Sequence, residues 1–418
     1  MTSSGIRRSF SSRLSKIQNF VAENGYKRGL IREFDWGLFL LTIGIALFGV
    51  ICIYAAYATP VEEAADTFLE TLAQQDSKYA RLQLLWLIAG LVVLFGMVFF
   101  DYHVFLRYAD LIYWTNLILL AVVLGMKPMR GNMTGWFRIG TDRTIQPSEF
   151  GKIAIIISLA KMFAARERPI MSPGELIRPL TFVGFPLILI VLQPDVGTAL
   201  VYIAIFAVVI FFSGTNWRLI VGIIALATLL IIPLWYLLNV SEDSFRLNRL
   251  MVYLDPTYDL SGSGMQVANA KIAIGSGGLW GKGMFSEGCF ASLNYIPDDY
   301  TDFVFAIVCE TFGFVGAGSL ILAFMVLIVR MVVIAYNTED AFGRYLVIGV
   351  TGMLFFHIFE NAGMVVGLLP VTGIPLPFIS YGGSNMFASM AGIGIVLNVA
   401  MRTRATKRTG KKLAVVEL

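Results

Sequence analysis

The sequence predicts an all-α, polytopic membrane protein with about ten transmembrane helices and a large outer loop between the seventh and eighth spans. Hydrophobic residues make up 57% of the 418 positions and charged residues only 14%, whereas a soluble domain carries about a quarter charged residues. Apolar runs of roughly 20 residues, the length that crosses a bilayer, recur along the whole chain. The alternating pattern of a membrane β-barrel is absent.

The two ends of the chain are polar and basic. Residues 1–35 contain no apolar segment early enough for a cleaved signal peptide, so we expect a cytoplasmic tail. This tail is either solvated or lies along the anionic inner leaflet, where each basic residue gains on the order of 1 kcal/mol. Residues 36–400 form the transmembrane domain and 401–418 a second basic tail. Lysine and arginine concentrate in the tails and in the loops on their side, which predicts that both termini are cytoplasmic.

Apolar segments of this kind predict ten spans, at 36–57, 82–100, 105–125, 148–165, 177–193, 197–213, 217–238, 301–335, 344–367 and 378–400. The segment 301–335 is too long for one crossing, so we expect it to tilt or to project beyond the bilayer.

The first basic outer loop, 127–148, leads into a polar helix start. Pro147-Ser148-Glu149 combines a proline, a capping hydroxyl and an acid, which is typical of a helix N-terminus. One interpretation is that the segment is only this cap. However, Lys152 follows Glu149 by about one turn, and a lysine inside a span is costly to bury unless it is paired or faces a wet cavity. We therefore expect a Glu149–Lys152 pair that also lines a polar cavity.

The outer loop 239–300 is the longest in the protein, and such loops are usually functional or disordered. Residues 265–274 are predicted to form a short amphipathic helix on the membrane surface. The glycine-rich stretch that follows is no P-loop, because Ser276 stands where the motif needs glycine and Gly283 replaces its Ser/Thr. We expect it to offer backbone N–H groups and Lys282 to an extracellular phosphate.

Two further segments interrupt the apolar pattern. The break at 192–199, which contains Asp195, is either a simple hairpin turn or irregular backbone that lines a cavity. Between 367 and 383 the prolines and glycines exclude a smooth helix. There we expect a re-entrant outer loop packed rigidly against the bundle.

Asp302 is the strongest catalytic candidate. It follows Thr301, which we expect to cap the next helix, and precedes a long apolar run, so it is predicted at the water-facing mouth of a span. An acid that activates a hydroxyl, with basic groups that hold an anionic leaving group, is the chemistry such residues support.

Other chemistries find less support in the sequence. With only His103 and His357, neither a histidine triad nor a zinc site is predicted, and the three cysteines show no disulfide or zinc spacing. Glu310, two turns into its span, is expected to be a buried structural partner, with Lys152 as the candidate counter-charge.

Several segments also occur together in one known family: Gly135-Trp136 through Gln146-Pro-Ser-Glu149, Gln193-Pro-Asp-Val-Gly-Thr-Ala199, Ile296-Pro through Thr301-Asp302-Phe303, and Gly367-Leu-Leu-Pro370 through Pro377 to Ser380-Tyr-Gly-Gly-Ser384. In this order they resemble the SEDS family (shape, elongation, division, sporulation) over roughly residues 36–400. The last segment is more similar to the family's elongation branch, RodA, than to its division branch, FtsW.

The resemblance implies a peptidoglycan glycosyltransferase that polymerises lipid II at the outer face of the bacterial cytoplasmic membrane, for elongation or sporulation. It also implies a class B penicillin-binding protein as the transpeptidase partner, and no nucleic acid. No metal site is predicted, and the use of a divalent cation stays open.

The resemblance also assigns roles to individual residues. The family's essential acid falls on Asp302, which would act as the general base on the acceptor hydroxyl. Trp136 matches a motif tryptophan that lines the cavity, and Glu149 and Lys152 match the family's polar pair. The candidates for the diphosphate of the lipid carrier are Arg246, Arg249 and Lys282.

The chain departs from the family pattern just before the predicted acid. The family more often has Pro-Glu-x-His there, and this chain has Pro297-Asp298-Asp299-Tyr300, which weakens any role for an assisting histidine. Two alternatives from other classes are a flippase for lipid-linked precursors and a scaffold for a transpeptidase. A flippase would depend on the deep charges Lys152 and Glu310, whereas a scaffold would not need Asp302.

Overall fold

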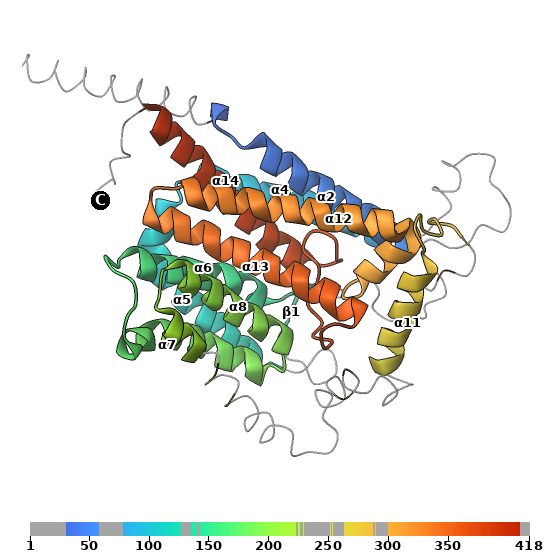
Figure 1. Cartoon of the computed structure of the whole chain (residues 1–418), viewed down its shortest axis with the longest axis horizontal. Coiled ribbons are helices and arrows are strands. Elements are labelled where there is room, and N and C mark those ends of the chain that lie inside the picture. Colours follow the sequence, from blue (N-terminus) through green and yellow to red (C-terminus); the bar gives the residue numbers. More distant parts are fainter. Residues whose placement is uncertain are drawn as a thin grey trace, which may run out of the picture.

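The computed structural model describes residues 31–57, 78–126, 135–139, 143–222, 225, 229, 251, 253, 263–286, 289 and 300–409. Most of these residues are helical, which confirms the predicted fold class. The helices lie alongside one another in a bundle (Figure 1). Within the described ranges, seven helices are long and apolar enough to cross a membrane.

The helices are α2 (Trp36–Ala56), α4 (Lys78–Phe99), α5 (His103–Leu124), α6 (Pro147–Ala164), α7 (Pro173–Leu192), α8 (Val196–Phe212), α11 (Ser263–Ser276), α12 (Val304–Asn337), α13 (Ala341–Val366) and α14 (Gly383–Thr409). Two short strands, β1 (Phe137–Ile139) and β2 (Arg143–Ile145), pair antiparallel, with Phe137 opposite Ile145. A helix matches each predicted span except 217–238, most of which lies outside the described residues. Two matching helices do not count among the seven, because α6 carries Glu149, Lys152 and Lys161 and α8 is only 17 residues long.

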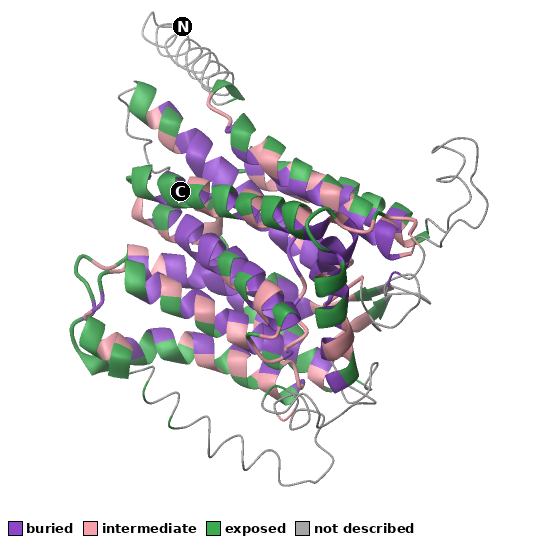
Figure 2. Ribbon diagram, turned by 45° about the vertical axis from the view of Figure 1, so that its right-hand side comes forward, coloured by how far each residue is buried: buried purple, intermediate pink, exposed green. Residues whose placement is uncertain are grey.

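The centre of the bundle is formed by the last two helices of the chain. In the apolar stretches of α13 and α14, 67% and 89% of the residues are buried, whereas only 22% are buried in that of α5. Figure 2 shows buried residues running through the interior and exposed residues along the flanking helices. Apolar side chains on the surface of the flanking helices are what a lipid-facing helix needs, because lipid tails solvate them.

The long helix α12 is broken near one end. Gly313 has φ 66° and ψ −167°, values that interrupt the helix and that glycine adopts more readily than other residues. The short first part of α12 bends away from the remainder (Figure 1). The predicted long segment is therefore not one continuous helix, because the residues before Gly313 form a separate short helix.

The segment 367–382 between α13 and α14 is irregular and packed, as predicted. Gly367 ends α13 in the left-handed conformation typical of a helix C-cap. Val371, Ile374, Leu376 and Phe378 are all buried. The predicted break at 192–199 is a tight turn, in which the Asp195 side chain accepts from the Thr198 N–H and caps α8.

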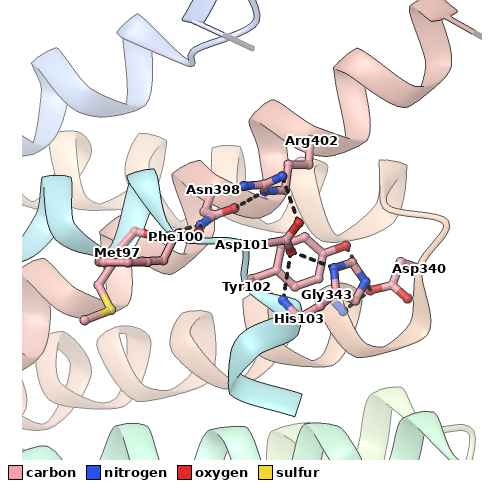
Figure 3. A network of polar contacts seen from close by, with 9 residues as sticks. All are labelled: Met97, Phe100, Asp101, Tyr102, His103, Asp340, Gly343, Asn398 and Arg402. Carbon is pink, nitrogen blue, oxygen red and sulfur yellow. Dashed lines mark hydrogen bonds and ion pairs between the residues drawn. The ribbon is translucent and has the colours of Figure 1, made fainter. Parts of the chain in front are cut away.

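Charged residues join the helices at the end of the bundle where the described chain begins and ends, hereafter the terminal end. Asp101, between α4 and α5, accepts a hydrogen bond from His103 at 2.8 Å and pairs with Arg402 of α14 at 2.9 Å. Asp340, before α13, accepts from the Tyr102 hydroxyl at 3.0 Å. Figure 3 shows these side chains lying close together. The opposite end, which carries Asp302, is hereafter the Asp302 end.

Candidate functional site

Asp302 lies half-buried, two residues before the first residue of α12. Phe303 occupies the N-cap position and its side chain makes no capping bond, so the predicted cap by Thr301 is wrong. A carboxylate just before a helix N-terminus is favoured in its ionised form by the helix dipole. Asp302 thus lies near the positive end of the α12 dipole.

The backbone at Asp302 is fastened to the neighbouring helix and loop. The side-chain amide of Asn361, on α13, donates to the Asp302 carbonyl at 2.8 Å and to the Ile374 carbonyl at 2.7 Å. Asn361 is fully buried, and buried amides of this kind are expensive to leave unsatisfied. One side chain therefore holds Asp302 against both α13 and the segment 367–382.

Four tyrosines surround the backbone just before Asp302. The ring centroid of Tyr300 lies 5.2 Å from that of Tyr57, 5.2 Å from that of Tyr79 and 5.7 Å from that of Tyr381. The Tyr381 N–H also donates to the Tyr300 carbonyl at 2.9 Å. Aromatic pairs at these distances are stabilising. Tyr300 thus joins the backbone just before Asp302 to the ends of α2 and α4.

A buried ionic cluster lies between α6 and α13. The Lys152 ammonium donates to Glu149 Oε1 at 2.6 Å, which confirms the predicted pair. It also lies 2.8 Å from His357 Nε2, a third member that the sequence analysis missed. His357 and Asn361 are polar residues four positions apart in an apolar span, hence on one helix face. That spacing is the signal from which a polar face on this span could have been predicted.

Some polar atoms beside this cluster have no hydrogen-bond partner among the residues that the structure describes. They are Glu149 Oε2, Ser148 Oγ and Gln193 Oε1, all buried. Buried polar atoms are almost always satisfied by protein, water or a bound group. The predicted polar cavity beside these atoms stays a prediction.

The loop that carries Trp136 lies beside these atoms. A Cβ on Gly135 would lie 3.6 Å from Gln193 Oε1 and 3.9 Å from Gln146 Nε2. Gln146 donates to Asp195 Oδ2 at 2.8 Å. Trp136, half-buried, follows directly and leads into β1. The motif residues before α6 and α8 are thus brought together at one place, whereas in the sequence they lie far apart.

Lys282 and Glu310 form a second ion pair, 2.9 Å apart, in which Glu310 is buried. The expected pairing of Glu310 with Lys152 is therefore wrong, because each finds a nearer partner. The backbone N–H groups of Lys282 and Gly283 donate to the carbonyls of Glu310 and Thr311. These two N–H groups of the glycine-rich stretch therefore bond to α12. The assignment of Lys282 to a diphosphate stays a prediction.

The remaining candidates cannot be placed. Arg246 and Arg249, predicted for the diphosphate, lie outside the described residues, as do Asp298 and Asp299. Within the described ranges, no group of three or more His, Cys, Asp or Glu side chains gathers as a metal site would.

Residues 263–276 form the predicted helix, α11, which packs against α12 and α13.

Comparison with known proteins agrees with the motifs. A family model described as a cell cycle protein, for FtsW, RodA and SpoVE, matches residues 35–405. The peptidoglycan glycosyltransferase MrdB of Escherichia coli (strain K12) is 37% identical over 310 residues, which cover 74% of this chain and 82% of MrdB. The stage V sporulation protein E of Bacillus subtilis (strain 168) is 32% identical over 376 residues, 88% of this chain and 98% of that protein.

Solved structures show the same architecture. One chain, from a structure described as a peptidoglycan synthase complex that coordinates polymerization and crosslinking, superposes with a TM-score of 0.72 at 30% identity, covering 88% of this chain and 98% of its own. The rod shape determining protein RodA of Thermus thermophilus superposes with a TM-score of 0.62 at 28% identity, covering 88% of this chain and 96% of RodA. The chain therefore belongs to the FtsW/RodA/SpoVE family, which is also called the SEDS family.

Proposed function

We propose that this protein is a peptidoglycan glycosyltransferase that polymerises lipid II, with Asp302 as its catalytic base. The observation that carries the proposal is the position of Asp302 at the mouth of α12, held through its own carbonyl by Asn361 and through the preceding tyrosine by Tyr381. A base must be held in a fixed orientation to abstract a proton efficiently. The glycosyltransferase activity named for the relative MrdB supports the same role.

In the proposed reaction, the Asp302 carboxylate takes the proton of a sugar hydroxyl on the acceptor. The oxygen of that hydroxyl then forms a bond to the anomeric carbon of the donor, while the bond from this carbon to the undecaprenyl diphosphate breaks. The bonding electrons leave with the diphosphate, whose growing negative charge needs positive groups nearby. Arg246, Arg249 and Lys282 are the residues proposed for this task.

The buried cluster around Lys152 is proposed to line the substrate cavity. Glu149 and Lys152 lie beside the unpartnered acceptors Ser148 Oγ and Gln193 Oε1, and Trp136 adds an aromatic wall near them. Polar groups that converge inside an otherwise apolar site fix the orientation of a ligand. The cavity then binds the sugar–peptide part of the substrate beside Asp302.

The proposed setting is the bacterial cytoplasmic membrane, with the Asp302 end outside and both termini in the cytoplasm. The excess of basic residues in the tails and their adjoining loops supports this orientation. The partner is proposed to be a class B penicillin-binding protein, which would crosslink the strands. The relative that was solved as part of a peptidoglycan synthase complex supports such a partnership.

The test is a polymerisation assay on purified full-length protein with labelled lipid II, with and without a class B partner. Glycan ladders from the wild type, and none from Asp302→Ala or Asp302→Asn of equal thermal stability, are the expected result. Wild-type-like ladders from either variant would remove Asp302 from the mechanism. Movement of lipid II across vesicles without any ladders would instead identify a flippase.

A further inference from the structure

Three large apolar side chains project from the protein where α12 breaks. Leu279 is 65% exposed, Trp280 79% and Phe314 72%. The first two form the tip of the turn after α11, and Phe314 follows the break directly. We call these three residues the tip patch. Exposed apolar residues gathered in this way usually mark an interaction surface.

Backbone hydrogen bonds lock the tip patch into the break. The Phe314 N–H donates to the Gly278 carbonyl at 2.9 Å, and the Val315 N–H donates to the Leu279 carbonyl at 3.1 Å. In the other direction, the Lys282 N–H donates to the Glu310 carbonyl at 2.9 Å. The turn thus satisfies the groups that a helix end leaves unpaired, which a lipid environment makes compulsory.

Glycines make this docking possible and fix its register. A Cβ on Gly277 would lie 2.0 Å from the Cys309 carbonyl oxygen, and a Cβ on Gly281 would lie 2.2 Å from the Thr311 carbonyl oxygen. Because only glycine allows so close an approach, the turn cannot slide along α12. Trp280 therefore keeps a fixed position relative to the helix.

The length of α12 gives the depth of the tip patch. The helix from Gly313 to Arg330 rises by about 26 Å at about 1.5 Å per residue, close to the roughly 30 Å of a hydrocarbon core. Arg330 pairs at 2.6 Å with Asp35 at the terminal end, which marks the polar boundary on that side. The break then lies near the opposite boundary, where tryptophan is enriched.

The tip patch continues the lipid-facing surface of α12. Beyond Phe314, the exposed residues Leu322, Met325 and Val329 recur at spacings of three and four along the same face. From this continuity we propose that Leu279, Trp280 and Phe314 insert into the bilayer interface at the Asp302 end and anchor the turn there. The partner of this surface is lipid.

The anchor also has a consequence for the site, which rests on the proposed function. The Lys282–Glu310 ion pair and its backbone bond join the anchored turn to the short first part of α12. Asp302 lies immediately before that part. A substrate whose diphosphate sits at the lipid headgroups must meet the base at one depth, and the anchor holds Asp302 at that depth.

Depth-dependent quenching tests the insertion itself. Trp280→Cys, labelled with a small environment-sensitive fluorophore, is reconstituted as full-length protein in vesicles that carry nitroxide lipids at shallow or deep positions. The native Cys52, Cys289 and Cys309 are all buried, so the label is selective. We expect stronger quenching by the shallow nitroxide at position 280 and by the deep one at Met325→Cys. If neither lipid quenches the label at position 280, the anchor is overturned. The patch would then face solvent or be covered by another protein.

A polymerisation assay separates the anchor from the proposed function. Trp280→Glu should lower polymer formation several-fold in vesicles, because a carboxylate withdraws the turn from the interface. The matched control is Trp217→Glu, since Trp217 is also exposed, at 67%, beyond the end of α8. If the label at position 280 is quenched but neither the wild type nor a variant polymerises lipid II, the anchor stands and the proposed function falls. Full activity of Trp280→Glu would remove the depth argument.

Discussion

The ammonium of Lys152 lies 2.8 Å from Nε2 of His357. An ammonium can only donate, so Nε2 accepts, and the ring is neutral with its proton on Nδ1. That proton is donated to the Met353 carbonyl at 2.7 Å. Together with the bond to Glu149, the lysine is held between an anion and a neutral acceptor deep in the bundle.

This arrangement predicts the stability of single variants at the cluster. Lys152→Ala should destabilise the protein by about 3–5 kcal/mol, because it leaves the Glu149 carboxylate buried and uncompensated. The double variant Glu149→Gln/Lys152→Met, which removes both charges, should lose less than Lys152→Ala alone. Thermal unfolding in detergent measures the difference. Equal melting temperatures for wild type and Lys152→Ala would contradict the coupling.

Asn361 is predicted to act as a positioning residue for Asp302. Asn361→Leu keeps the size of the side chain but removes both donated hydrogen bonds, so the Asp302 backbone loses its tie to α13. Since a misplacement of about 1 Å can cost about 100-fold in rate, kcat should fall by tenfold or more while KM changes little. Steady-state polymerisation kinetics make the measurement. A rise in KM with unchanged kcat would assign Asn361 to substrate binding instead.

Two neighbouring glycines offer a matched pair of substitutions. Gly281 and Gly278 both have positive φ, at 81° and 56°, but only Gly281 meets a backbone oxygen, at 2.2 Å from its added Cβ. Gly278→Ala should cost about 1–2 kcal/mol, the penalty of the left-handed conformation. Gly281→Ala should cost clearly more, because the turn can no longer dock on α12. Protease accessibility of the turn, compared between the two variants, reports the undocking, and identical digestion of both would refute it.

Acid sensitivity is predicted at the terminal end. Burial raises the pKa of Asp35, but hydrogen bonds from Arg330 and the Leu38 N–H, together with the charge of Arg404, hold this pKa below its ordinary value. A depressed folded-state pKa contributes stability above the unfolded pKa of about 3.9 and loses it as the pH falls through the folded value.

Asp35→Asn should therefore be less stable than wild type at neutral pH, and the difference should shrink below about pH 4. Melting temperatures of both proteins between neutral and acidic pH check this. A difference that stays constant with pH would show that the Asp35 charge is not responsible.

The sequence alone predicted the features that depend on local pattern. Apolar length located each described span, and the spacing of Glu149 and Lys152 predicted their ion pair, because both depend on neighbours within one helix. The break at Gly313 was missed, since no proline marks it and the glycine-rich turn that satisfies it lies about 30 residues earlier in the chain.

The contacts around the candidate site were missed for the same reason. Glu310 was assigned to Lys152 because both are charges inside spans, and only the folded chain brings Lys282 closer. The tie between Asn361 and Asp302 joins residues that are far apart in the sequence. No periodicity encodes such long-range pairs. The sequence suffices to propose Asp302 as the acid, but not to predict the residues that hold it.

The docked turn at Gly313 limits how this protein can be recombined with its relatives. Residues 277–283 supply the hydrogen bonds that the backbone of α12 needs at its break, so the turn is structurally part of the span although it is a loop. A chimera with its junction between the turn and α12 would pair one protein's turn with another's helix and strand the backbone groups of both. Functional junctions should lie before α11 and after α12, so that turn and helix are exchanged as one unit.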